Sequence, residues 1–327
     1  GQRTLERSAN AEAISHLTTG LELLGTLPDS LARAQQELVL QTTLGLALMA
    51  IKGYAAPEVA DAYARARELS KQVGEAPQLA SVLYGLWIFH QVRGELRTAH
   101  EAVQQFMRLA RSVQDPALLL EAHHALGQVL HFLGEFSSAR EHSELGIASY
   151  NPQLNSPYVR PALQDPGVMC LCYAAWSLWY LGYPDQALKR CEEALALARE
   201  LSHPFSLAFA LHTMACVCLY RQEWNVAQEW AEAEVSFCTE QGFALFVILG
   251  SIYRGRALTE QGQRVEECIG QIRQSLAAYR ATGAENGRPY FLAILAEAYG
   301  KTGQVEEGLT VLTEALAAVD NMRERFY

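Results

Sequence analysis

Apolar residues recur every three or four positions in a series of segments along the chain, which is the spacing of one face of an α-helix. Turns that contain glycine or proline separate these segments. The pattern predicts an all-α chain of fifteen helices with no β-sheet. The expected helices cover residues 9–25, 30–51, 56–73, 77–93, 95–113, 116–133, 136–149, 166–182, 184–201, 204–221, 223–241, 243–261, 264–282, 287–302 and 304–320.

A turn marker, which is glycine in all but one case, recurs at a regular interval between pairs of helices. The markers are Gly53, Gly94, Gly134, Gly182, Gln222, Gly262 and Gly303. From Gly94 onward they are 40, 48, 40, 40 and 41 residues apart. A glycine at such a place can adopt the left-handed conformation that ends a helix. The sequence therefore predicts repeated helical hairpins.

Small residues flank the markers at constant distances. Seven positions before a marker stand Gly127, Ala175, Ala215, Gly255 and Ala296, and most repeats have a small residue five positions after it. Facing small residues let the two helices of a hairpin approach closely. This order resembles the tetratricopeptide (TPR) motif, although its usual period is about 34 and HEAT or armadillo units also fit about 40. We expect a right-handed α-α superhelix of about seven TPR-like hairpins with a ~40-residue period.

The same pattern suggests one continuous array. We expect residues 1–327 to form a single TPR-like solenoid, cut from a longer array because the first helix lacks a partner and Arg323–Tyr327 resembles the start of another repeat. The step of 48 residues places an insertion at residues 150–167, where four prolines exclude a regular helix. This insertion is either a lid over the binding groove or a plain surface loop.

Composition narrows the classes of function. The net charge of −10 repels phosphate groups, so neither nucleic acid nor an anionic membrane is an expected partner. An odd number of cysteines, seven, favours free buried thiols in a reducing cytosol. No apolar run reaches the roughly 18 residues of a membrane span. These features predict a cytoplasmic protein.

Catalytic motifs are not recognisable in the sequence. A phosphate-binding loop and a nucleophile–base pair are both lacking, so we expect no enzyme and no cofactor. Four histidines, His123, His124, His131 and His142, raise the question of a metal site. No cysteine or carboxylate completes a set at known ligand spacing, apart from Glu121 near the same face, so we expect no metal.

Several stretches resemble a more particular family. They begin at Asp115 (DPALLLEAHHALG), Leu181 (LGYPDQAL), Leu201 (LSHPFSLAFALH) and Gly287 (GRPYFLAILAEAYG). These strings are similar to the C-terminal TPR region of bacterial proteins that join a class III adenylate/guanylate cyclase domain to an AAA-type ATPase domain. The resemblance implies a regulatory sensor or docking region of a bacterial signalling protein. The cyclase and ATPase motifs themselves are absent from this sequence.

The first helix of each TPR hairpin lines the concave groove, and its inward positions lie thirteen, ten, six, three and two residues before the turn marker. Counting back from the markers gives a candidate binding site centred on the repeats of Gly134, Gly182 and Gln222. The candidate residues are Tyr84, Glu121, His124, Gln128, His131, Trp176, Trp179, Tyr180, His212, Tyr220 and Arg256. Their rings and polar groups suit a ligand with apolar and hydrogen-bonding parts. A shift of one helical position would instead turn Trp176 and Trp179 into the core.

Two functions fit these residues. The first is a protein-interaction module that binds a protein, a peptide or another domain of its parent chain in the groove. The alternative is a sensor that binds a small-molecule effector in an aromatic-lined pocket. An open groove favours the first function, and a closed pocket favours the second.

Overall fold

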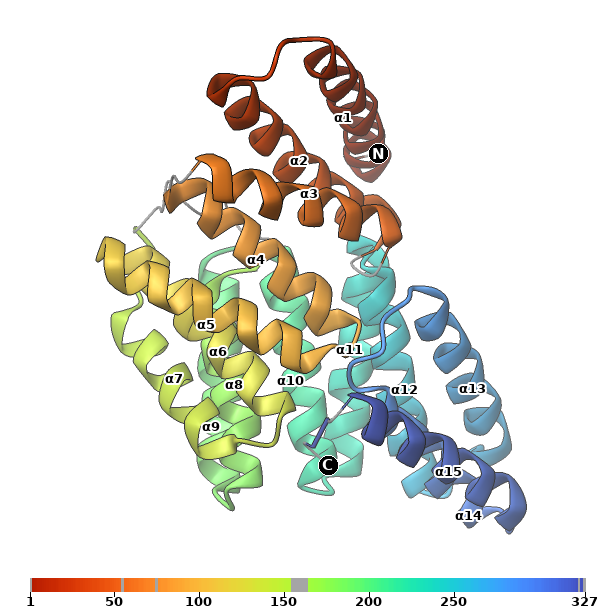
Figure 1. Ribbon diagram of the computed structural model, residues 1–327. Helices are drawn as coiled ribbons and strands as arrows, with labels where there is room; N and C mark the ends of the chain where they lie inside the picture. Colours follow the sequence, from red (N-terminus) through yellow and green to blue (C-terminus); the bar gives the residue numbers. More distant parts are fainter. Residues whose placement is uncertain (1, 54–55, 74–75, 154–163, 323, 326–327) are drawn as a thin grey trace. The chain divides into compact units, whose positions relative to one another are not determined.

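The structure is a computed structural model that describes residues 2–53, 56–73, 76–153, 164–322 and 324–325 (Figure 1). Within these residues the regular structure consists of fifteen helices and no strand, which confirms the all-α helical-repeat fold. The helices are α1 (Gln2–Gly25), α2 (Leu31–Lys52), α3 (Pro57–Val73), α4 (Ala76–Val92), α5 (Leu96–Val113), α6 (Pro116–Phe132), α7 (Phe136–Ser149), α8 (Pro166–Tyr180), α9 (Pro184–Glu200), α10 (Pro204–Tyr220), α11 (Trp224–Gln241), α12 (Ala244–Glu260), α13 (Val265–Ala281), α14 (Arg288–Lys301) and α15 (Val305–Met322).

The predicted helix boundaries are correct to within two residues, with one exception. Helix α1 begins at Gln2, whereas the apolar pattern predicted a start at residue 9. Residues 2–8 include no glycine or proline, so the backbone can stay helical beyond the amphipathic part. The amphipathic pattern alone therefore placed the start of the helix too late.

All seven turn markers have the positive φ that the sequence predicted, between +60° and +90°. Gly53 combines it with ψ 162°, which lies outside the left-handed helical region. After the marker Gly134, the amide of Glu135 donates to the carbonyl of Leu130 at 2.9 Å. The same six-residue closure ends α10, where the amide of Glu223 donates to Cys218 at 3.0 Å. These bonds satisfy carbonyls that a helix end leaves free. Gln222 adopts this conformation at φ +60° although it has a side chain.

Small residues bring the helices of a hairpin together, as the sequence predicted. A Cβ added to Gly127 on α6 would lie 2.6 Å from the Ser143 hydroxyl oxygen on α7. One added to Gly308 on α15 would lie 3.4 Å from the carbonyl of Ala296 on α14. Larger side chains at these places would push the two helices apart.

The chain divides into two compact units, and the division falls inside α6. The first unit contains α1 to α5, the part of α6 up to Ala122, and Thr282–Ala284. Its hairpins α2–α3 and α4–α5 pack tightly, and Trp87, Tyr63 and Phe106 are fully buried there. A Cβ on Gly85 of α4 would lie 2.0 Å from the Tyr63 ring of α3.

The second unit begins at His123 and contains the hairpins α8–α9, α10–α11, α12–α13 and α14–α15. Its first helices contact one another in succession, α8 with α10, α10 with α12, and α12 with α14. These helices therefore form one layer inside the unit. A single array over residues 1–327 stays a prediction.

Part of the predicted insertion, residues 154–163, lies outside the described residues. A hydrogen bond joins residues near the two ends of the insertion: the hydroxyl of Tyr150 donates to the carboxylate of Asp165 at 2.9 Å. None of the described helices is long and apolar enough to cross a membrane.

Candidate binding site

The inner layer of the second unit carries a continuous set of ring contacts. We call it the aromatic network, and it comprises His131 on α6, Trp176, Trp179 and Tyr180 on α8, His212 and Tyr220 on α10, Tyr253 and Arg256 on α12, and Tyr290 on α14. Each member contacts at least one other member. Seven of the eleven predicted site residues are therefore brought together.

One row of the network remains partly accessible at the ends of the helices. The hydroxyls of Tyr180 and Tyr220 form a hydrogen bond of 3.0 Å, although the residues are 40 positions apart. Trp179 stacks on Tyr220 with a centroid distance of 5.5 Å and an interplanar angle of 19°. All three side chains are half-buried. They present ring faces and hydroxyls to whatever covers this layer.

A second row lies deeper. The ring of Trp176 is 5.7 Å from His131 and 6.1 Å from His212, measured between centroids. His212 stacks on Tyr253 at 4.7 Å and 11°. The ring of Tyr253 packs edge-on against the ring of Tyr290 with a centroid distance of 6.4 Å, so the ring contacts extend to α14. The four residues Trp176, His212, Tyr253 and Tyr290 are buried, so this row supports the accessible row from beneath.

His212 also contacts the outer helix of its own hairpin. Its Nδ1 lies 3.0 Å from Oε1 of Glu234 on α11, and the Glu234 carboxylate is fully buried. Burial raises the pKa of Glu234, and the neighbouring imidazole opposes that rise. His212 was predicted to line the groove, and the structure places it below the accessible row with only 5% of its surface exposed.

His131 provides a neutral hydrogen-bonding group within the network. Burial lowers the pKa of its imidazole to about 3, so the ring carries no charge at pH 7. Its Nδ1 faces the hydroxyl oxygen of Ser177 at 3.4 Å. Phe136, at the start of α7, lies 5.6 Å from the same ring and stacks on Tyr180 at 4.5 Å and 9°.

Arg256 is the cation of the network. Its Nη1 donates to the hydroxyl of Tyr290 at 3.1 Å, and its Nη2 forms an ion pair with Glu297 at 3.0 Å. The guanidinium carbon also lies 5.8 Å from the centroid of the Tyr290 ring. Its buried Nε has no acceptor within the described residues. Arg256 is therefore held in place with one donor unused.

The other predicted site residues lie elsewhere. His124 is buried and Gln128 half-buried on α6, and their assignment to the groove rests on helix register alone. Glu121 belongs to the first unit and is buried. Tyr84 also belongs to the first unit, where it packs edge-on against Trp87 at 5.3 Å in the hairpin core. A binding role for these four residues stays a prediction.

Sequence reasoning missed Phe136, Tyr253, Tyr290, Glu234 and the segment Glu324–Arg325. Tyr290 was within reach, since it stands thirteen residues before Gly303, which is an inward position by the rule applied to the earlier repeats. Glu234 lies on α11, the second helix of its hairpin, whereas the counting rule selects positions on first helices only. Two of the four histidines that raised the question of a metal site are in contact with each other. Nδ1 of His123 and Nδ1 of His142 are 2.9 Å apart. No group of three or more metal-ligating side chains occurs within the described residues.

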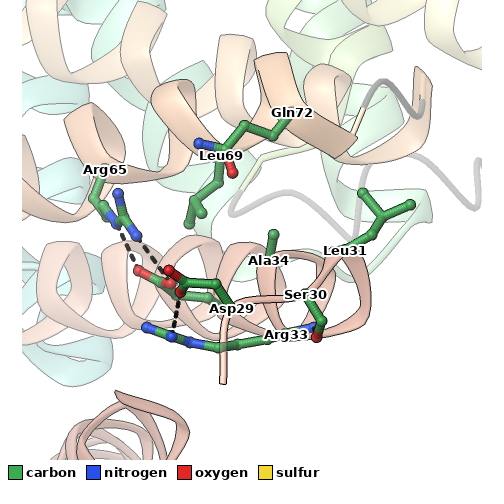
Figure 2. Close-up of a pocket in the computed structure, with 9 residues that line it drawn as sticks. Asp29, Ser30, Leu31, Arg33, Ala34, Arg65, Leu69 and Gln72 are labelled. Carbon is green, nitrogen blue, oxygen red and sulfur yellow. Dashed lines mark hydrogen bonds and ion pairs between the residues drawn. The ribbon is translucent and has the colours of Figure 1, made fainter. Parts of the chain in front are cut away.

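A separate hollow lies between α2 and α3 in the first unit (Figure 2). Arg65 donates to both carboxylate oxygens of Glu37, at 2.6 and 3.0 Å. Arg33 pairs with Asp29 on the same rim, as the dashed lines in Figure 2 show. Its charged side chains therefore neutralise one another, and the hollow lacks the aromatic character of the second unit.

Solved structures show what the chain is similar to. A Rap protein complexed with Competence and Sporulation Factor is 10% identical, with a TM-score of 0.66 and 98% of both chains covered. The Rap conjugation regulator of plasmid pLS20, in complex with a Phr peptide, is 15% identical, with a TM-score of 0.69 and coverage of 91% of this chain and 79% of that one. A STAND signal-transduction ATPase with a TPR sensor from Pyrococcus horikoshii is 9% identical, with a TM-score of 0.52 and coverage of 97% and 53%. At these identities the likeness establishes the fold, that of a TPR-like helical repeat.

Sequence comparison adds one curated relative. An uncharacterized protein of Rhizobium meliloti (strain 1021) is 22% identical over 321 residues, which is 97% of this chain. The chain spans 31% of the length of that relative. No protein-family model matches the chain.

Proposed function

We propose that the chain is a regulatory module that binds a protein or peptide segment on the aromatic network of its second unit. The observation that carries this proposal is the continuity of ring contacts from α6 to α14, with Trp179, Tyr180 and Tyr220 half-buried at its edge. Tyrosine and tryptophan supply large contact area and hydrogen bonds at low entropic cost, which is why they dominate binding surfaces.

Folding alone accounts poorly for these side chains. Within the hairpins α6–α7 and α14–α15, the small residues Gly127 and Gly308 face the partner helix at close range. Trp179 and Tyr180 stand near the end of α8, and Tyr220 ends α10. A large half-buried ring at such a place gains the rest of its burial when a partner covers it.

The solved relatives agree with a peptide ligand. Two Rap proteins of this fold are named in complex with a factor or a Phr peptide, and a third similar structure carries its TPR array as the sensor of an ATPase. Together with the resemblance to cyclase–ATPase fusion proteins, this supports a regulatory part of a larger bacterial signalling protein. The role is one of recognition, and catalysis belongs to other domains.

The test is selection of a displayed library of random 12-residue peptides on the intact chain, followed by affinity measurement by fluorescence anisotropy. Trp179→Ala should weaken the selected peptides by about tenfold or more, as loss of a central aromatic contact does. The matched control is Tyr183→Ala, which removes an exposed aromatic residue at the neighbouring turn.

Equal loss in the control, or unchanged binding in Trp179→Ala with the fold intact by circular dichroism, would overturn the proposal. Failure to select any peptide, together with saturable binding of a metabolite that Trp179→Ala abolishes, would favour the small-molecule sensor.

A further inference from the structure

Two residues near the end of the chain lie across the second unit. After α15, the non-helical residues Glu324 and Arg325 contact both the start of α14 and the end of α6. The amide of Gly287 donates to Oε1 of Glu324 at 2.6 Å, and the amide of Arg325 donates to the carbonyl of Phe132 at 2.9 Å. The segment is thus held by one side-chain carboxyl and one main-chain hydrogen bond.

The carboxyl end of this contact is deeply buried. Glu324 has no exposed surface, and its Oε2 has no hydrogen-bond partner within the described residues. Gly287 precedes the first turn of α14 with φ +76°, so its amide has no intrahelical acceptor and can donate outward. Arg325 donates to Phe132, whose ring lies 5.7 Å from that of His131 in the aromatic network, measured between centroids. The segment therefore lies beside the proposed binding site.

The main-chain end fits closely against a turn marker. A Cβ added to Gly134 would lie 2.7 Å from the Arg325 carbonyl oxygen. The neighbouring marker Gly182 has the same kind of backbone, at φ +85°, with no atom within 4 Å of an added Cβ. Any residue other than glycine at position 134 would therefore have to displace Arg325, whereas a side chain at position 182 would meet open space.

We propose that Glu324–Arg325 is an intramolecular ligand of the second unit, and that the partner displacing it is a non-helical peptide with a carboxyl side chain. This inference rests on the proposed function, because it names the chemistry of the peptide that the aromatic network would recognise. Both contacts are ones that another peptide can reproduce. Its main-chain amide would donate to Phe132, and its aspartate or glutamate would accept from Gly287.

The probe is a fluorescein-labelled peptide with the sequence of residues 321–327, Asn-Met-Arg-Glu-Arg-Phe-Tyr. In the wild-type chain the probe competes with the attached segment. The apparent affinity of the probe is therefore its intrinsic affinity multiplied by the fraction of chains in which the segment is undocked. Glu324→Ala in the chain removes the carboxyl contact of the attached segment but leaves the site unchanged. Gly134→Asn, added to that variant, places a Cβ where the main chain of a bound probe would follow the path of Arg325, while tolerating the left-handed turn. Glu324→Ala should bind the probe about tenfold or more tightly than the wild type, and the added Gly134→Asn should remove that gain.

Two controls make the result specific. Gly182→Asn, added to Glu324→Ala in the same way, carries the same change at a turn with open space, so it should leave the gain in probe affinity in place. A second probe with alanine in place of its glutamate should bind Glu324→Ala at least about tenfold more weakly than the first probe does, because it lacks the acceptor for Gly287.

Unchanged probe affinity in Glu324→Ala, or the same loss on adding Gly182→Asn as on adding Gly134→Asn, would refute the intramolecular ligand. Equal binding of the alanine probe would refute the carboxyl preference. Either failure leaves the proposed function intact if library peptides still bind and still depend on Trp179. Loss of that dependence is the result that defeats the proposed function itself.

Discussion

Raising the pH should release Glu324–Arg325 from the second unit. Burial raises the pKa of the Glu324 carboxyl to about 8, against an ordinary value of 4.5, while the Gly287 amide opposes the rise. The neighbouring carboxylate of Glu285, just before α14, raises it further. The docked segment at pH 7 therefore holds a proton that a free glutamate has already lost.

The other titratable groups near this carboxyl do not change the sign. Tyr180 on α8 and Tyr279 on α13 both feel its charge, and burial raises the pKa of both phenols, so they stay neutral over the range. Docking is strongest below about pH 4.5, where both states are protonated. From there to about pH 8 it weakens by about tenfold per pH unit, and above that it is constant.

The assay is steady-state fluorescence anisotropy of a dye attached through Arg325→Cys. The Arg325 side chain is exposed and the seven native cysteines are buried, so the new thiol is the accessible one. Anisotropy should fall as the pH rises from 5.5 to 8.5. Glu324→Gln in the same labelled chain keeps an oxygen for the Gly287 amide but cannot ionise, so its anisotropy should stay level. A fall of the same size in Glu324→Gln, or a rise with pH in the parent, refutes the linkage.

Four further substitutions test the turns and the packing within the two units. Gln222→Gly should raise stability by about 0.5–1 kcal/mol in thermal melts, because glycine avoids the cost of the left-handed turn, and Gly182→Gln should lower it comparably. His212→Leu leaves the Glu234 carboxylate buried and unpaired, so urea unfolding at pH 7 should show a loss of about 3–5 kcal/mol, and a loss below 1 would contradict the pairing. Gly85→Ala places a Cβ against the Tyr63 ring and should cost about 1–3 kcal/mol, and an unchanged melting temperature would refute that contact.

The helices and turns were predictable because local chemistry determines them. A left-handed turn selects glycine, and the marker spacing was regular enough to identify Gln222 as a member of the series before its φ of +60° was known. Helix register also explains why Tyr180 and Tyr220, which stand at equal distances from their markers, form a hydrogen bond with each other. Local rules therefore reached as far as the inner layer.

Helix register and turn chemistry do not predict contacts between residues that are far apart in the sequence. His212 was assigned to the groove, yet its main polar contact is Glu234, 22 residues later on the outer helix of its hairpin. Pairing across a hairpin depends on how far the helices rotate and approach, which a single sequence does not reveal. The contact between Arg325 and Phe132 depends on the fold of the whole second unit. Nothing in the residues of Glu324–Arg325 indicates that they meet α6.

The extra residues in the step of 48 precede α8, and Asp165 fixes where that helix begins. The ring contacts between α6 and α8 therefore depend on Asp165. Its side chain accepts from the amide of Val168 at 3.0 Å and so sets the first turn of α8. Its own amide donates to the Ser206 hydroxyl oxygen on α10 at 2.8 Å, and its carboxylate accepts from Tyr150. One residue thus ties α8 to the next hairpin and to the end of α7. Because α8 then begins in register, its Tyr180 meets both His131 and Tyr220, at centroid distances of 5.8 and 5.6 Å. The extra residues are absorbed before α8 begins, and the aromatic network crosses the insertion without a break.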